Sequence, residues 1–303
     1  MKARLGVFIC SLLLLPPAGL WLSGYGWNAI SSGELAEIVN TPAVLLTTLL
    51  FAGYTLLVNH MIKLLTGNSP LDLQRDYFLQ MSAASAVLGW LLVYLNLFVA
   101  SWVTQPDNPI MQSLLYTPLF ALLGPAVLIT RALLGSFAGF LKYLSHGIPL
   151  PGLRSETLVL ILTALAVSGL AGGAAWPEKL FWLLWLAPLL LLAALQLLWG
   201  ENTIFSGLKS GDWGRLTCTA LAGLIVGNFV IFAYQNNGGI ITLTLPTPLL
   251  AQLGYPAFGL LCLQLSDVLA ENMRGKKQAN PPRKTFPIPV VGKPTSNNKT
   301  NHV

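Results

Sequence analysis

Charged residues are scarce in this chain of 303 residues. They make up 9% of it, against about a quarter of a typical soluble domain, whereas hydrophobic residues make up 54% and the mean hydropathy is +0.66. A protein this poor in charge could not hide its apolar surface inside a soluble globule. We therefore expect the lipid bilayer to be its solvent.

Cysteine is rare, and the familiar catalytic motifs are missing. Cys10, Cys218 and Cys262 have no paired spacing, which argues against a disulfide framework and against a zinc site. The sequence contains no nucleophile elbow, P-loop or Asp-rich prenyl-phosphate pattern. It therefore predicts no metal site and leaves any cofactor unknown.

Long apolar runs account for most of the chain. A helix needs about 20 apolar residues to cross the ~30 Å hydrocarbon core of a bilayer. The sequence predicts an all-α, polytopic transmembrane helix bundle of about eight spans. The predicted spans are 5–22, 42–65, 77–103, 109–130, 156–175, 180–199, 216–234 and 248–269.

Basic residues lie almost entirely on one side of these spans. Every Lys and Arg except Lys179 lies before the first span, in alternate loops or in the C-terminal tail. Because basic residues in short loops stay in the cytoplasm, we expect both termini there and the protein in the inner (plasma) membrane. Helices that begin on the opposite side each start at a proline, which suits a first helical turn. These prolines are Pro42, Pro109, Pro177 and Pro248.

The first predicted span has an alternative as a signal peptide, because Lys2 and Arg4 precede its apolar run. A retained helix fits better, since the run is long, Pro16-Pro17 interrupts it and no clear A-x-A site follows. Cleavage would leave seven spans with the same orientation.

The C-terminal segment 272–303 differs from the membrane domain predicted over 1–271. It has seven basic residues, no acidic residue and five prolines, so we expect a disordered cytoplasmic tail. Its cations would attract anionic lipid headgroups at ~1 kcal/mol each, or simply keep the tail soluble and inside. No folded module accompanies the charge, so nucleic-acid binding is not expected.

Small and polar residues within the spans predict how the helices pack. Asn96 and Asn228 lie in mid-span and predict hydrogen bonds between helices. Gly-x-x-x-Gly pairs predict close helix packing, with a homodimer face as the alternative. These pairs are Gly135 and Gly139, Gly169 and Gly173, and Gly223 and Gly227.

Residues 131–154 follow the fourth span and are too polar at their ends for another one. They could lie along the cytoplasmic surface, with apolar side chains in the lipid and cations near phosphates. Alternatively, they prolong the fourth helix beyond the membrane.

The loop at 200–215 is the richest polar segment. Glu201 and Asp212 could act as a catalytic acid/base pair at the membrane surface. The simpler alternative is a turn-rich connector in which Asp212 caps the next helix. The residues that could bind a phosphorylated substrate are Asn202, Lys209, Trp213 and Arg215.

Asp267, near the inner end of the last span, is a second candidate for substrate binding. Gln264, Asp267 and Glu271 recur at helical spacing and share one helix face. A carboxylate at this depth would need a cation, and Arg131 or Lys63 is the expected partner.

Two classes of function follow from these features. The first is a multi-pass inner-membrane protein that binds or transports a lipid or other hydrophobic molecule, or serves as a membrane subunit of a larger assembly. Its partners would be the bilayer and possible membrane proteins, including a second copy of the chain. The alternative is a membrane-embedded enzyme acting on a lipid-linked or phosphorylated substrate at the cytoplasmic face.

Overall fold

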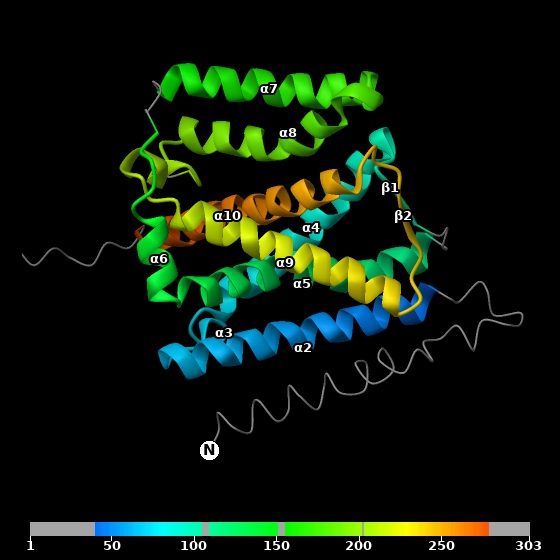
Figure 1. The fold of residues 1–303 in the computed structure, drawn as a ribbon, viewed down its shortest axis with the longest axis horizontal. Coiled ribbons are helices and arrows are strands. Elements are labelled where there is room, and N and C mark those ends of the chain that lie inside the picture. The colour runs from blue at the N-terminus through cyan, green and yellow to red at the C-terminus, as the bar shows by residue number, and fades with distance from the viewer. Residues whose placement is uncertain (1–39, 105–108, 151–154, 202, 279–303) are drawn as a thin grey trace, which may run out of the picture.

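The computed structural model describes residues 40–104, 109–150, 155–201 and 203–278 (Figure 1). Within these ranges, seven helices are long and apolar enough to cross a membrane, so the chain is a multi-pass membrane protein. They are α2 (Asn40–Thr66), α4 (Arg75–Val99), α5 (Pro109–Gly135), α7 (Ser155–Ala175), α8 (Pro177–Leu198), α9 (Gly214–Asn236) and α10 (Pro248–Gln278). They correspond to seven of the predicted spans. The predicted span 5–22 and the tail from residue 279 lie outside the described residues.

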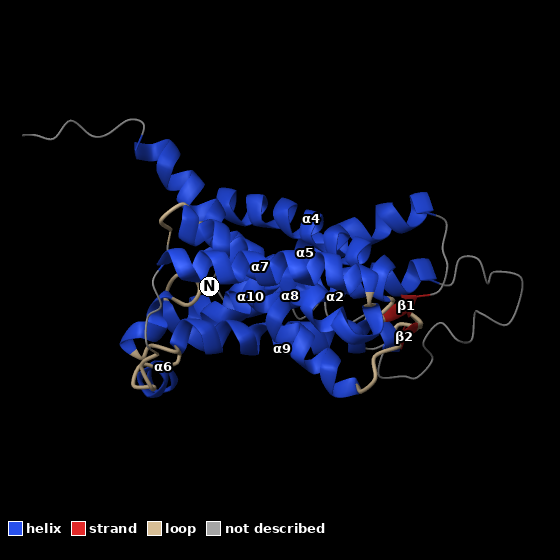
Figure 2. Ribbon diagram, turned by 90° about the horizontal axis from the view of Figure 1, so that it is seen from above, coloured by secondary structure: helices blue, strands red, loops and turns tan. Residues whose placement is uncertain are grey.

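The long helices alternate in direction, so the molecule has two distinct ends (Figures 1 and 2). We call one the strand end, because it carries β1 (Trp102–Thr104) and β2 (Ile241–Leu243). We call the other the basic end. It carries α3 (Pro70–Leu73), α6 (Ala138–Leu144), η3 (Ser206–Ser210) and the C-terminal end of α10. The side of the membrane that each end faces stays a prediction from the charges.

The helix α5 lies at the centre of the bundle. It packs against α2, α4 and α9, and α9 in turn packs against α10. The hairpin of α7 and α8 lies on the side away from α2 and contacts the rest chiefly through α8, by way of α10 and α4 (Figure 1).

The predicted third span is wrong at its C-terminal end. The helix α4 stops at Val99, and Ala100 takes a left-handed conformation with φ of 44°. Trp102–Thr104 then pairs antiparallel with Ile241–Leu243, as aromatic and β-branched residues allow. The side chain of Asn96 holds this turn, donating to the Trp102 carbonyl at 2.8 Å and accepting from the Trp102 N–H at 3.2 Å. The interhelical hydrogen bond predicted for Asn96 is therefore wrong.

The interhelical hydrogen bond predicted for Asn228 is confirmed. Asn228 on α9 and Gln252 on α10 exchange two amide hydrogen bonds of 2.7 Å each. Between these same helices, an added Cβ on Gly223 would meet the Tyr255 carbonyl oxygen at 2.4 Å, so only glycine allows this approach. On α7, Gly169 and Gly173 pack equally closely on α8. These two glycine pairs serve packing within one chain.

The segment after α5 prolongs the fourth helix only in part, and its position along the membrane surface stays a prediction. The fourth helix does continue past Thr130, but it ends at Gly135, and Ala138–Leu144 forms a separate short helix. Gly135 and Gly139 therefore lie on different helices, and neither has an atom within 4 Å of an added Cβ. The close packing predicted for this pair is wrong.

Replacing Gly223 with alanine should loosen the bundle, because its methyl group would press on the backbone of α10. We expect Gly223→Ala to lower the free energy of unfolding by about 1–3 kcal/mol. Gly254→Ala on α10 is the control, since nothing lies within 4 Å of the added Cβ there and alanine favours a helix. Thermal unfolding in mild detergent measures both, and equal stabilities would contradict this packing.

Candidate functional site

An ion pair joins two helices at the basic end. Arg215 Nη2, in the first turn of α9, donates to Asp267 Oδ2 near the end of the apolar stretch of α10. Their side chains are 30% and 22% exposed, so the pair is largely withdrawn from water. The structure thus brings together two of the predicted substrate-binding residues. Of the two partners predicted for Asp267, Lys63 is wrong, because its Nζ lies 3.0 Å from Asp72 Oδ2 instead. Arg131 does lie within electrostatic range of Asp267, but Arg215 makes the ion pair.

A second arginine lies beside this pair. Arg131 on α5 is half-buried and within electrostatic range of Arg215, Asp267 and the Tyr77 hydroxyl. It makes no ion pair or side-chain hydrogen bond with any residue that the structure describes. Two guanidinium groups therefore lie close to the Asp267 carboxylate, and only Arg215 forms an ion pair with it among the described residues. We call Tyr77, Arg131, Arg215 and Asp267 the charge cluster.

Tyr77 completes the charge cluster from α4. Its hydroxyl lies 3.4 Å from the carbonyl oxygen of Ser266, the residue before Asp267. Four helices, α4, α5, α9 and α10, therefore each place one polar side chain at the same point. An acceptor-rich group such as a phosphate would find two guanidinium groups and a phenol there.

The two predicted catalytic residues have different surroundings. Asp212 Oδ1 accepts the Gly214 N–H at 2.9 Å, so it caps the start of α9 as the simpler alternative predicts. Glu201 follows α8, and its Oε2 is buried without a hydrogen-bond partner. Burial raises the pKa of Glu201, and the nearby Glu271 carboxylate raises it further. Lys209 is exposed, and Asn202 lies outside the described residues.

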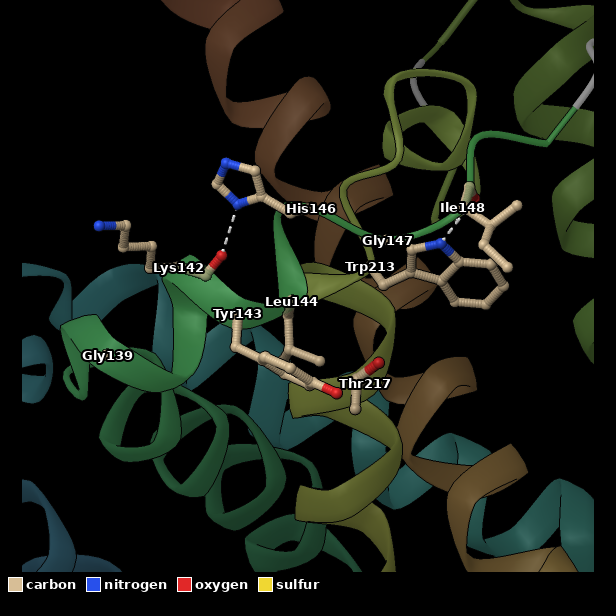
Figure 3. A pocket seen from close by; sticks show the side chains of 9 residues that line it. All are labelled: Gly139, Lys142, Tyr143, Leu144, His146, Gly147, Ile148, Trp213 and Thr217. Atoms are coloured by element: carbon tan, nitrogen blue, oxygen red, sulfur yellow. Dashed lines mark hydrogen bonds between the residues drawn. The ribbon is translucent and has the colours of Figure 1, made fainter.

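Trp213 does not belong to the charge cluster but lines a separate surface pocket. This pocket of about 780 Å³ lies between α6 and the start of α9 (Figure 3). Trp213 Nε1 donates to the Ile148 carbonyl at 3.0 Å, and Lys142 and His146 bring the polar groups. Trp213 and Thr217 share one face of α9, whereas Arg215 points to the interior.

Two buried glutamines are candidate site residues that the sequence does not predict. Gln196 on α8 and Gln264 on α10 are both 0% exposed, and neither amide oxygen or nitrogen has a hydrogen-bond partner. Its spacing from Asp267 and Glu271 predicts only that Gln264 shares their helix face. A single glutamine within the leucine-rich run of α8 was the available signal for Gln196.

Within the described ranges, no group of three or more His, Cys, Asp or Glu residues could hold a metal ion. Comparison with known protein families, curated proteins and solved structures finds no match to this chain. The functional argument therefore depends on the geometry of the basic end.

Removing the carboxylate of Asp267 should destabilise the fold, since two arginines would face each other without an acid between them. We expect Asp267→Asn to lower the free energy of unfolding by about 1–3 kcal/mol. Asp72→Asn is the matched control because its ion pair with Lys63 is exposed, and it should cost about 0–1 kcal/mol. Equal losses of unfolding free energy in the two variants would show that the Arg215–Asp267 pair stabilises the fold no more than an exposed ion pair does.

The raised pKa of Glu201 predicts a pH dependence of stability. The folded protein holds this proton more tightly than the unfolded chain does. Its contribution is therefore complete below the ordinary glutamate pKa and is lost as pH rises through the raised value. We expect Glu201→Gln to remove this decline, measured as the difference between wild-type and variant unfolding curves from pH 4 to 8. Parallel curves would contradict the assignment.

Proposed function

We propose that this multi-pass protein lies in the inner (plasma) membrane and binds an anionic amphiphile, such as a phospholipid or another lipid phosphate, at its basic end. The observation that carries the proposal is that Arg131, beside the Arg215–Asp267 pair, has no ion-pair partner of its own among the described residues. An uncompensated cation inside a helix bundle is costly, and an anion relieves that cost.

The position of the charge cluster favours a lipid over a soluble anion. Arg131 and Asp267 both lie on helix stretches long and apolar enough to span a bilayer, near their ends at the basic end. At that depth, a molecule with an acidic headgroup and an apolar chain can place its headgroup near the arginines and its chain along the apolar helix surface. Guanidinium groups hold phosphate by paired hydrogen bonds, so Arg131 and Arg215 suit such a headgroup.

The predicted orientation agrees with this proposal. If the basic end faces the cytoplasm, the charge cluster lies on the side of the leaflet that carries anionic lipids. The basic tail predicted over 272–303 would gather the same headgroups nearby. Lipid transport and a role as a membrane subunit would both build on such binding, and a partner protein stays a prediction.

The enzyme alternative has less support. It needs Glu201 and Asp212 to act on one substrate, but Asp212 is engaged with the backbone of α9. Lys209, which would bind the phosphate of that substrate, is exposed. These contacts favour binding over catalysis.

Replacing Arg131 should remove the lipid response. Phosphatidic acid added to wild-type protein in neutral detergent should raise the unfolding temperature, and phosphatidylcholine with the same acyl chains should not. At a lipid concentration of 100 times Kd, the stabilisation is about 2.7 kcal/mol. We expect Arg131→Gln to weaken phosphatidic acid binding at least about tenfold, because a charge-assisted hydrogen bond is lost.

Lys142→Gln is the control, since Lys142 is an exposed cation at the same end that lines the separate pocket of Figure 3. It should keep the wild-type response. Loss of binding in Lys142→Gln with normal binding in Arg131→Gln would move the lipid site to the pocket and overturn the proposal.

A further inference from the structure

The amides of Gln196 and Gln264 have no hydrogen-bond partner, whereas another glutamine on α10 does. Gln252 on α10 is satisfied, because its amide exchanges two hydrogen bonds with Asn228. Gln196 and Gln264 are fully buried, and all four of their amide atoms lack partners. A buried polar group without a partner is destabilising. Leucine would fill the same positions without that penalty, so these two amides need another explanation.

The two glutamines lie toward the basic end of two neighbouring helices. Both α8 and α10 run from the strand end to the basic end, and they pack against each other (Figure 1). Glu201 and Glu271 lie within electrostatic range of each other at the basic end. The Glu201 N–H donates to the Gln196 carbonyl at 2.8 Å, so Glu201 lies within one turn of Gln196, and Gln264 precedes Glu271 by seven residues, or about two turns of α10. Gln264 is also one turn from Asp267 of the charge cluster.

Polar side chains hold α8 against the rest of the bundle at the strand end. At the strand end, the Trp185 ring stacks on Trp102 with centroids 5.0 Å apart, and Trp185 Nε1 donates to Ser101 Oγ at 3.0 Å. At the basic end, neither Gln196 on α8 nor Gln264 on α10 makes a side-chain hydrogen bond across this seam. Opening the seam there breaks no bond of either glutamine and frees both amides to find partners.

The chemistry of an amide selects the ligand. Each glutamine offers both a donor N–H and an acceptor oxygen, whereas a phosphate only accepts and an ammonium group only donates. A hydroxyl group does both. We infer that the seam between α8 and α10 opens at the basic end, and that Gln196 and Gln264 then bind the hydroxyl groups of a lipid headgroup. This inference rests on the proposed function, because the phosphate of the same lipid lies on Arg131.

Phosphatidylglycerol and phosphatidic acid with identical acyl chains separate the two proposals. Both carry a phosphate, but only the first carries a headgroup polyol. Titrated into full-length protein in neutral detergent, phosphatidylglycerol should bind wild type about five- to tenfold more tightly. Gln196→Leu and Gln264→Leu should each bind phosphatidic acid normally and lose the preference. Neither should be less stable than wild type without lipid, since each loses an unpaired amide.

Gln252→Leu is the matched control on the same helix. It should keep the headgroup preference but lower the unfolding temperature, because Asn228 loses its partner. Gln264→Met, which keeps the length of the side chain, replaces the leucine variant if that variant fails to fold.

Three results would overturn the inference. Equal affinity of wild type for the two lipids would do so while leaving the proposed function intact. A drop in stability of Gln264→Leu as large as that of Gln252→Leu would show that its amide is already paired in the fold. Absence of binding to either lipid would remove the proposed function and the inference together.

Discussion

The ion pair between Arg215 and Asp267 is the interaction on which the rest of the basic end depends. It ties α9 to α10 at a depth where an unmatched charge is costly. Because Asp267 is engaged by Arg215, Arg131 is left beside them with no carboxylate of its own. The same pair turns Arg215 inward, so the first turn of α9 separates the charge cluster from the surface pocket that Trp213 lines.

Hydropathy and proline position predicted most of the bundle, because they are read along the chain without knowledge of neighbours. Seven spans are present, and α5, α8 and α10 begin at Pro109, Pro177 and Pro248. The wrong predictions concerned side-chain partners, which depend on which helices lie next to each other. Asp267 pairs with Arg215 only because α9 and α10 are adjacent, and Asn96 holds a turn only because the chain leaves α4 at Ala100.

The polar residues inside the bundle divide by whether the fold satisfies them. Asn228 with Gln252 and Tyr54 with Thr130 form hydrogen bonds between helices, so they are explained by stability. Gln196, Gln264 and Arg131 have no described partner and burden the folded state. These three groups all lie toward the basic end. A ligand that bound them would stabilise the folded state most.

The most direct test of lipid binding is native mass spectrometry of the full-length protein released from membranes in mild detergent. The proposal predicts an anionic lipid retained at one per chain in the wild type and released in Arg131→Gln. Equal retention in both proteins, or retention of neutral lipids alone, would contradict it.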